Sequence, residues 1–321
     1  MFGLGNLKPR LNVTDHHVEC PINGCRVRVP RQCRVFKPDS RFLCSDHRIY
    51  ISPSTFEYEN KLDNLLWTSA EDLALLNAIR GAKRESRMAR DNSEDALTWN
   101  VFRHLEKTGA LRDYSATLTG RSPSAVDVVY WSYSQRHRGG WPELVNARRE
   151  FGESPGHGSE PDLILIADDA LLWIEAKLTA TNVTMPRDPE NKKKYVTGGD
   201  HWYRHAFTSN YDSVAKKHKK YELLRLWLLG SWIASRLRRD FYLVSLERAG
   251  HGEGPKATFA QHLRANPHRH FLTATWEDVY TFVRDRNLPS VEGQRLLTYL
   301  SEKTIGYANG VLRPAFSIDR L

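Results

Sequence analysis

Apolar residues recur at helical spacing over much of the chain, and this period predicts several helices. The pattern begins at about residue 59, after an N-terminal stretch without long apolar periodicity. A second helix is predicted to begin at Asn92 or Ser93, because either side chain can cap the first free amides. A long helix is predicted over residues 211–238, and further helical patterns at about residues 256–305 close the chain.

Between these helices, shorter runs have the composition of strands. Residues 126–133 are β-branched and aromatic, and residues 241–246 are apolar, so each run predicts a strand. Leu163–Ala167 and Ala170–Ala176 are two apolar runs separated by Asp168-Asp169. Two runs joined by so short a polar link predict a β-hairpin.

Length, composition and charge limit the class of protein. At 321 residues, 40% hydrophobic and 26% charged, the chain suits one substantial core and a smaller satellite domain. It contains no run of the roughly 20 apolar residues that a membrane-spanning helix needs, and its start does not resemble a secretory signal. We therefore expect a cytoplasmic protein with no membrane partner. The formal net charge of +9 favours a polyanionic partner, although a solvated basic surface would give the same composition.

All four cysteines lie near the N-terminus, which predicts a small metal-binding module over residues 1–58. Cys20 and Cys25 form one short-spaced pair, and Cys44 and His47 form another. Zinc prefers four nitrogen and sulfur ligands that are often delivered as two such pairs. We expect these four residues to bind structural zinc, with Cys33 as an alternative fourth ligand in place of His47. Buried cysteines without a metal remain the simpler alternative.

The predicted hairpin carries three side chains suited to phosphodiester hydrolysis: Asp162, Glu175 and Lys177. Side chains alternate along a strand, so Glu175 and Lys177 point to the same face. If Asp168-Asp169 forms a two-residue turn, Asp162 falls opposite Glu175, with Cβ atoms about 4.5–5.5 Å apart. Two such carboxylates can bind one magnesium or manganese ion, and the lysine could orient or deprotonate the attacking water. Taken alone, the Glu-x-Lys pattern is common and is usually an ordinary charged strand end.

The wider pattern resembles the PD-(D/E)xK superfamily of restriction-endonuclease-like nucleases. Pro161-Asp162, an apolar hairpin and then Ile174-Glu175-Ala176-Lys177 stand in that family's helix, three strands, helix, strand order over residues 93–246. The resemblance implies an α/β fold with a mixed central sheet flanked by helices, here spanning residues 59–321. It also implies a magnesium-dependent endonuclease in which Asp162 and Glu175 bind the metal and Lys177 is the catalytic lysine.

Glu94 resembles the additional acid that many members of this family supply from the first core helix. It shares a helix face with the apolar Leu97 and Val101. Judged by position alone, it is an acid in an exposed first turn, where the helix dipole favours it. Related branches place Gln and Tyr on the helix after the lysine strand, and this chain has Tyr221 there but no Gln.

Lysines are dense in residues 186–240, which follow the predicted catalytic strand. Lys216 and Lys220 are four residues apart and would be neighbours on a helix surface. We predict that these two lysines contact nucleic-acid phosphates, whereas the rest of the charge run is solvated.

Together these patterns predict a nuclease that hydrolyses DNA phosphodiester bonds, with a role in restriction or phage defence by analogy alone. Three alternatives stay open: an RNase, a catalytically inactive nucleic-acid-binding protein, and a zinc-stabilised interaction protein. The expected partner is nucleic acid, and a homodimer is left open as the assembly.

Overall fold

The computed structural model describes residues 3–82, 87–154, 158–250, 254–287 and 290–318. Its contacts divide the chain into two compact units. The first unit comprises Met1–Ala70, Ser86–His104 and Thr275–Leu321, and the second comprises Glu71–Glu85 and Leu105–Ala274. Within the described residues, no helix is both long and apolar enough to cross a membrane.

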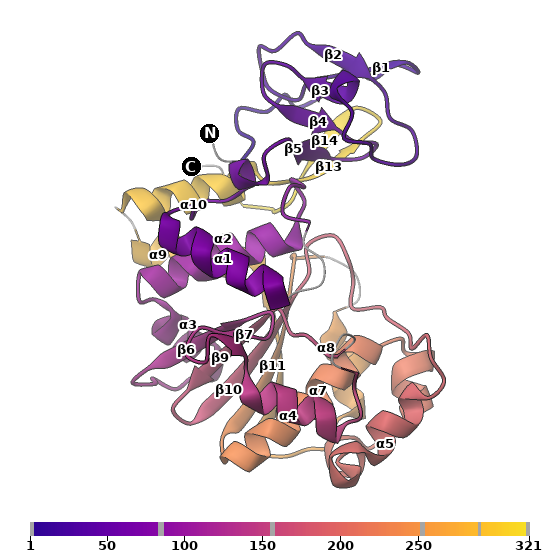
Figure 1. The fold of residues 1–321 in the computed structure, drawn as a ribbon, viewed down its shortest axis with the longest axis vertical. Helices are drawn as coiled ribbons and strands as arrows, with labels where there is room; N and C mark the ends of the chain where they lie inside the picture. The colour runs from indigo at the N-terminus through magenta and orange to yellow at the C-terminus, as the bar shows by residue number, and fades with distance from the viewer. Residues whose placement is uncertain (1–2, 83–86, 155–157, 251–253, 288–289, 319–321) are drawn as a thin grey trace. The chain divides into compact units, whose positions relative to one another are not determined.

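A mixed sheet forms the centre of the second unit (Figure 1). Its seven described strands lie in the order β12-β11-β10-β9-β6-β7-β8. Their bounds are β6 Val126–Tyr130, β7 Tyr133–Ser134, β8 Gly139–Gly140, β9 Leu163–Ala167, β10 Ala170–Ala176, β11 Asp240–Glu247 and β12 Arg269–Thr275. Strand β10 is parallel to β11, whereas β6, β7, β8, β9 and β10 are joined by antiparallel pairing. The predicted α/β class with a mixed central sheet is confirmed.

Helices flank this sheet, and two of them lie against its central strands (Figure 1). The helices with residues in the second unit are α1 Ala70–Ala82, α2 Glu94–Lys107, α3 Leu111–Thr119, α4 Pro142–Glu150, α5 Asn191–His201, α6 Tyr203–Ala206, α7 Tyr221–Leu237 and α8 Pro255–Phe259, with the short helices η3 Ser213–Lys217 and η4 Ala260–His262. Helix α7 packs on β10 and β11, and α3 packs on β6 and β9. Because α7 connects two parallel strands, it is the crossover helix that such pairing requires.

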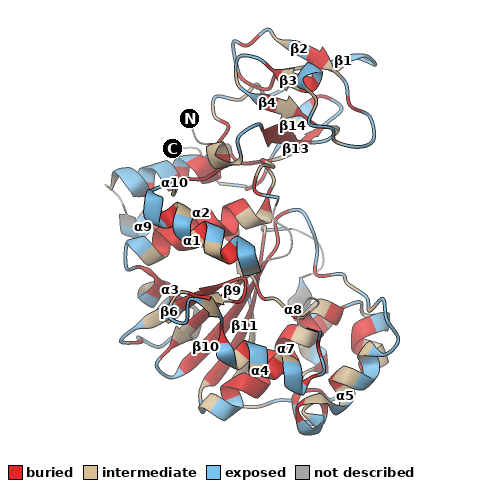
Figure 2. Ribbon diagram, viewed as in Figure 1, coloured by how far each residue is buried: buried red, intermediate tan, exposed pale blue. Residues whose placement is uncertain are grey.

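The hairpin predicted from the sequence is present with the predicted strand bounds. Leu171 pairs with Ile166 and Ile174 pairs with Leu163, so the turn between the strands consists of Asp168 and Asp169. Every residue of β10 is buried, and β11 is buried throughout (Figure 2). A strand covered on both faces needs apolar residues at successive positions, which explains the continuous apolar run.

The packing of α7 on the sheet depends on one small residue. Trp173 of β10 and Phe241 of β11 contact each other edge to face, with ring centroids 6.0 Å apart. Both rings lie against Gly230 in the middle of α7, where an added Cβ would be 2.3 Å from the Phe241 ring and 3.1 Å from Trp173. Glycine at this position therefore lets the helix approach the two aromatic rings closely.

The long helix predicted over residues 211–238 is interrupted, so that prediction is wrong in part. A π-helix, Ser213–Lys217, ends before Lys219, which has a left-handed backbone with φ 54°, and α7 begins at Tyr221. The cause is pairing with a distant segment. The Thr184 amide donates to the Lys219 carbonyl at 2.7 Å, and the Thr184 carbonyl accepts from the Tyr221 amide at 3.2 Å.

This interruption also corrects the predicted placement of Lys216 and Lys220 as neighbours on one helix surface. Lys220 lies outside both helices and its side chain is buried, with 5% exposure. Lys216 is exposed and forms an ion pair with Asp212 at 2.8 Å. The two lysines therefore do not share a helix face, whatever each contacts.

The described residues of the first unit form three small antiparallel sheets. Their strands are β1 His17–Glu19 with β2 Arg28–Pro30, β3 Leu43–Cys44 with β4 Ile49–Ile51 and β5 Phe56–Tyr58, and β13 Thr304–Ala308 with β14 Val311–Pro314. The unit also contains η1 Ser40–Phe42, η2 Lys61–Asn64, α9 Trp276–Asn287 and α10 Val291–Glu302. One apolar core joins the N-terminal strands to the C-terminal hairpin.

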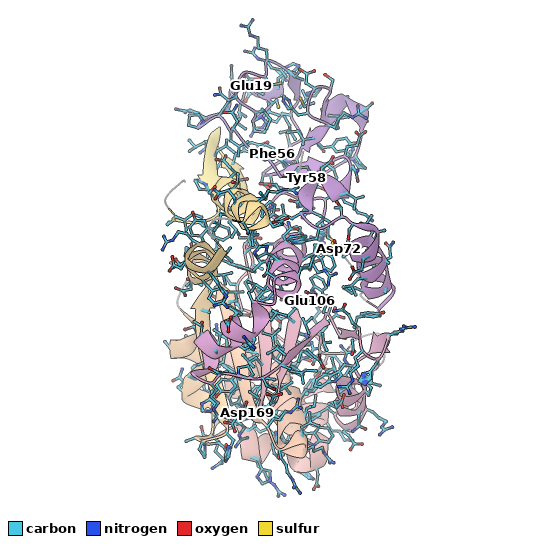
Figure 3. All side chains as sticks on the ribbon, turned by 90° about the vertical axis from the view of Figure 1, so that its left-hand side faces the viewer. Glu19, Phe56, Tyr58, Asp72, Glu106 and Asp169 are labelled. Atoms are coloured by element: carbon cyan, nitrogen blue, oxygen red, sulfur yellow. The ribbon has the colours of Figure 1, made fainter. Side chains whose placement is uncertain are left out.

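The C-terminal hairpin packs against strands of the predicted N-terminal module, residues 1–58. Tyr307 of β13 stacks on Phe56 of β5, whose side chain is labelled in Figure 3, with centroids 5.5 Å apart. Gly306 passes so close to the Ser54 carbonyl that a Cβ would lie 1.9 Å from its oxygen. A module of about 58 residues has little apolar surface to bury alone, and the C-terminal hairpin adds to its core.

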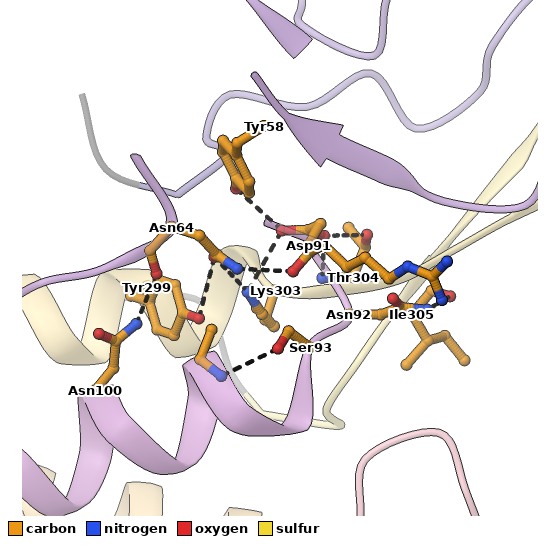
Figure 4. A network of polar contacts seen from close by, with 12 residues as sticks. Tyr58, Asn64, Asp91, Asn92, Ser93, Asn100, Tyr299, Lys303, Thr304 and Ile305 are labelled. Carbon is orange, nitrogen blue, oxygen red and sulfur yellow. Dashed lines mark hydrogen bonds and ion pairs between the residues drawn. The ribbon is translucent and has the colours of Figure 1, made fainter. Parts of the chain in front are cut away.

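A buried polar network ties three segments of the first unit together (Figure 4). Lys303 has 2% exposure, and its ammonium donates to Asn64 at 2.9 Å and lies 3.5 Å from the Asp91 carboxylate. Tyr58 and Thr304 also donate to Asp91, at 3.1 Å and 2.6 Å. A buried charge is costly unless it is paired and hydrogen-bonded, and here both charges are.

The packing at Gly230 predicts that Gly230→Ala destabilises the second unit. Helix propensity alone would make alanine more stable by about 1 kcal/mol. Overpacking against the two rings should outweigh this gain, for a net loss of about 1–3 kcal/mol. Urea unfolding followed by circular dichroism measures the change.

Gly81 of α1 provides the matched control, because among the described residues only its chain neighbours and the backbone of its own helix come within 4 Å of the position that a Cβ would take there. Gly81→Ala should stabilise the protein by up to about 1 kcal/mol. Equal effects of the two substitutions would contradict the close approach at Gly230.

Candidate active site and metal centre

The carboxylate of Asp162 lies at the end of the hairpin, opposite Glu175. The β9–β10 register ends at Leu163 and Ile174, and one further step pairs Asp162 with Glu175, as predicted. Its Oδ2 accepts from the Ala176 amide at 2.9 Å, and its Oδ1 accepts from Trp131 Nε1 at 3.1 Å. One donor on β10 and one in the turn after β6 therefore fix the orientation of this carboxylate.

Trp131 reaches Asp162 from a tight turn between β6 and β7. Trp131 and Ser132 have φ values of 43° and 76°, which is uncommon for residues other than glycine. Two consecutive positive φ values are typical of the two-residue hairpin turns whose twist matches the strands. The Trp131 amide also donates to the Asp162 carbonyl at 3.2 Å, so this turn holds both backbone and side chain.

Glu175 is buried, with 3% exposure, and only one of its oxygens is satisfied. Oε1 accepts from the Lys177 ammonium, whereas Oε2 is buried and has no hydrogen-bond partner among the described residues. Burial raises the pKa of Glu175 well above its usual range, and the positive charge of Lys177 opposes that shift. A buried acceptor without a donor requires an explanation, and a bound cation would provide one.

Lys177 lies among acidic groups at the end of β10. Its ammonium contacts Glu175 and lies 3.1 Å from Glu222, and its backbone amide donates to Leu246 at 2.8 Å. Burial by itself lowers the pKa of Lys177, but the negative charges of three nearby carboxylates raise it well above its ordinary value. Lys177 is therefore a fixed positive charge in this arrangement.

Glu222 was not predicted from the sequence. It lies in the first turn of α7, and its carboxylate contacts Lys177. A crossover helix runs back along the sheet, so its first turn lies near the carboxyl end of the preceding strand. An acid in the first turn of the crossover helix could therefore have been recognised from the sequence, although its spacing from Lys177 gives no indication.

A second polar group that the sequence did not indicate lies on the adjacent strand. Ser245 pairs in register with Glu175, and Glu247 follows it at the end of β11. Asn182 Nδ2 donates to Ser245 Oγ and to Glu247, each at 2.7 Å. All three side chains are buried, so the polar surface around Glu175 extends across two strands.

The segment before Asp162 is held by a cluster of polar side chains. Ser159 donates from its amide to Glu153 at 2.6 Å, and its carbonyl accepts from Arg148 Nε at 2.9 Å. Arg225 of α7 donates to the Ser159 hydroxyl at 3.0 Å, and Tyr195 donates to Glu153 at 2.6 Å. These contacts restrain the chain three residues upstream of the metal-ligand candidate.

Glu94 begins helix α2, as the cap prediction required. The Ser93 hydroxyl accepts from the Ala96 amide at 3.1 Å, which confirms Ser93 as the capping residue. Glu94 is half-buried and belongs to the first unit, whereas Asp162 and Glu175 belong to the second. Its assignment to the carboxylate site stays a prediction.

A cluster of three cysteines and one histidine in the first unit could hold a metal ion such as zinc. One ligand atom from each of Cys20, Cys25, Cys44 and His47 lies within 4.8 Å of all the others. Two sulfur atoms, of Cys25 and Cys44, are 3.9 Å apart, and His47 Nδ1 is 3.7 Å from Cys20 and 3.6 Å from Cys44. In tetrahedral zinc sites, bonds of about 2.3 Å to sulfur and 2.0 Å to nitrogen place ligand atoms about 3.5–3.8 Å apart. The spacing fits such an ion.

The local turns explain this geometry. Gly24 has φ 80° and lets the Cys25 amide donate back to Ile22 at 3.1 Å, which forms the tight turn expected before Cys25. Burial raises the pKa of the Cys20 and Cys44 thiols, and a bound cation would instead stabilise their thiolates. Cys33 is exposed and outside the cluster, so the alternative four-cysteine set is not the one brought together.

In comparisons with known proteins, no family model, curated protein or solved structure matches this chain.

The metal centre predicts one zinc ion per chain, which Cys25→Ser should largely remove. The midpoint of thermal unfolding should fall with it, because binding at a structural zinc site contributes directly to folding. Elemental analysis of protein purified without chelator measures the metal.

Cys33→Ser is the control and should keep one zinc ion per chain. Zinc retained in Cys25→Ser, or lost in Cys33→Ser, would contradict the assigned ligand set.

Proposed function

We propose that this chain is a magnesium-dependent nuclease of the PD-(D/E)xK type that hydrolyses DNA phosphodiester bonds. The observation that carries the proposal is the meeting of Asp162, Glu175 and Lys177 at one end of the hairpin, with a buried Glu175 oxygen that has no donor among the described residues. Binding of nucleic acid alone does not require two paired acids beside a lysine.

The order of elements in the chain supports the same family. Helix α2, strands β6, β9 and β10, helix α7 and strand β11 follow one another in the helix, three strands, helix, strand order, with shorter elements between them. The chemistry of the donors is also suitable, because carboxylate oxygens are the ligands that magnesium prefers. Asp162 and Glu175 would hold the ion.

In hydrolysis, a bond forms between the water oxygen and phosphorus, one phosphorus–oxygen ester bond breaks, and the departing sugar oxygen takes up a proton. When bound, magnesium would polarise a phosphate oxygen and make a coordinated water a better nucleophile.

Lys177 places a fixed positive charge beside the two carboxylates, where negative charge develops on the phosphate in the transition state. Its ammonium contacts Glu175 and Glu222 on two different elements, which favours a role in orienting water and stabilising charge. Glu222 anchors the lysine from α7.

The substrate must also be held by positively charged side chains outside the carboxylate site. Lys217 and Lys219 are exposed, lie directly before α7, and have no ion-pair partner within the part of the chain that the structure describes. They are better placed to contact phosphates than Lys220, which is buried, or Lys216, which is paired with Asp212. We therefore assign the phosphate contacts first to Lys217 and Lys219.

The catalytic assignment predicts that Asp162→Asn, Glu175→Gln and Lys177→Ala each lower the cleavage rate by about 100-fold or more. Loss of one electrostatic contact to a transition state commonly has an effect of that order. Zinc-loaded protein is incubated with plasmid, single-stranded DNA and RNA, with and without added magnesium, and product formation is followed over time. The RNA arm separates a DNase from an RNase.

Glu190→Gln and Lys193→Ala are matched controls, because both side chains are exposed in the second unit. They should cleave like the unsubstituted protein, and circular dichroism should show all variants folded. Cleavage without magnesium, or undiminished cleavage by folded Glu175→Gln and Lys177→Ala proteins, would refute the assignment.

The phosphate contacts predict a weaker salt dependence of DNA binding when Lys217 and Lys219 are replaced. Each lost contact should reduce the slope of log K against log salt by about 0.9 on duplex DNA. Lys217→Gln is combined with Lys219→Asn, because asparagine tolerates the left-handed backbone at that position. Binding is measured over a salt series in a Lys177→Ala background to prevent cleavage.

Lys216→Gln serves as the control from the same segment, since this lysine already forms an ion pair with Asp212. Its slope should change little. An unchanged slope in the double variant would place the DNA contacts elsewhere.

A further inference from the structure

The second unit contains a cavity of about 500 Å³ that is separate from the carboxylate site. Asp169 and Asp240 contribute to its wall, and they lie at the start of β10 and β11. Glu175 and Lys177 lie at the opposite end of β10, six and eight residues along the chain from Asp169. A strand rises about 3.3 Å per residue, so roughly 20 Å separates the cavity from the proposed site of cleavage.

One arginine contacts both acidic groups of this cavity. Arg121 contacts Asp169 at 2.9 Å and Asp240 at 2.5 Å. His268 adds a contact to Asp240 at 2.7 Å. Arg121 offsets only one of the two negative charges, but the lining contains four arginines against these two aspartates and so has a net positive charge.

Three more arginines line the cavity, and none of them has an ion-pair partner among the described residues: Arg238, Arg239 and Arg269. Arg269 is half-buried, and its Nη1 is fully buried without a hydrogen-bond acceptor within the described structure. Burial, together with the charge of Arg264, lowers the pKa of Arg269. A buried guanidinium nitrogen with no acceptor is costly, and a bound anion would satisfy it.

A fixed aromatic surface adjoins these arginines. Trp202 lies 5.8 Å below the Arg269 guanidinium, and its Nε1 donates to Ser231 at 2.8 Å, which fixes the plane of the indole. The His205 ring lies 5.5 Å from the indole and also lines the cavity. Planar rings of this kind stack on nucleobases.

We propose that this cavity binds a nucleoside phosphate. The phosphate would contact the three unpaired guanidinium groups, whose planar forks match phosphate geometry, and the base would pack against Trp202. The volume is within the range of about 300–1,000 Å³ typical of small-molecule sites. The nucleoside phosphate could be a free nucleotide or the phosphorylated end of a nucleic acid, and this inference does not depend on the proposed cleavage activity.

Isothermal titration calorimetry on the Lys177→Ala protein, without added magnesium, tests the proposal with AMP, adenosine and inorganic phosphate. AMP should bind at one site, and adenosine and phosphate should each bind at least about tenfold more weakly, because each lacks one half of the contacts. A short oligonucleotide with and without a 5′-phosphate distinguishes the two sources. Phosphate-dependent binding of the oligonucleotide identifies a nucleic-acid end, and binding of AMP alone identifies a free nucleotide.

Arg269→Gln should weaken binding of the preferred ligand by about ten- to a hundred-fold, as expected for loss of a charge-assisted hydrogen bond. Arg238→Gln, at the exposed rim, gives a second variant if Arg269→Gln does not fold. Trp202→Ala should weaken the binding of AMP but leave the binding of inorganic phosphate unchanged. This difference separates the contribution of stacking from that of charge.

Arg236→Gln is the matched control, because this arginine is on α7 beside the cavity but packs on Trp232 outside the cavity wall, 4.0 Å from the ring. It should bind like the parent protein. The proposal is overturned if neither AMP nor the phosphorylated oligonucleotide binds, or if binding is the same in the Arg269→Gln, Arg238→Gln and Arg236→Gln proteins.

Discussion

The hydrogen bonding of β10 to β9 on one side and to β11 on the other determines where every group of the candidate active site lies. Antiparallel pairing with β9 sets Asp162 against Glu175, and parallel pairing with β11 brings Ser245 alongside. Because the parallel pair requires a crossover helix, Glu222 arrives at the same end of the strand. A shift of one residue in either register would move Glu175 to the other face of the sheet.

Local features of the sequence predicted those parts of the protein that depend on local interactions. The hairpin bounds followed from two apolar runs and a two-residue polar link. The cap was predictable to within one residue, as Asn92 or Ser93, because the amide that Ser93 accepts from is only three residues away. The cysteine cluster was predictable for the same reason, since the members of each ligand pair are at most five residues apart. Its interpretation as a metal site followed from ligand type and spacing.

The parts that could not be predicted depend on segments far apart in the chain. Pairing of Thr184 with residues 219–221 interrupts a stretch with helical periodicity, and no residue within that stretch signals it. The composition near residue 58, where the sequence predicts a domain boundary, likewise does not indicate that Tyr307 packs on Phe56. Glu222 was missed because its role depends on the direction of a crossover helix and not on spacing from Lys177.

The division of the first unit among three separate stretches of chain bears on how the protein forms during synthesis. The buried Lys303 that pairs with Asp91 and Asn64, and the Tyr307 that covers Phe56, leave the ribosome after every strand of the central sheet. Strands β6 to β11 all emerge before residue 248. The nascent chain can therefore form most of that sheet before the C-terminal residues that pack on the N-terminal strands have been synthesised. Only after synthesis has passed residue 307 can both parts of the protein be fully folded.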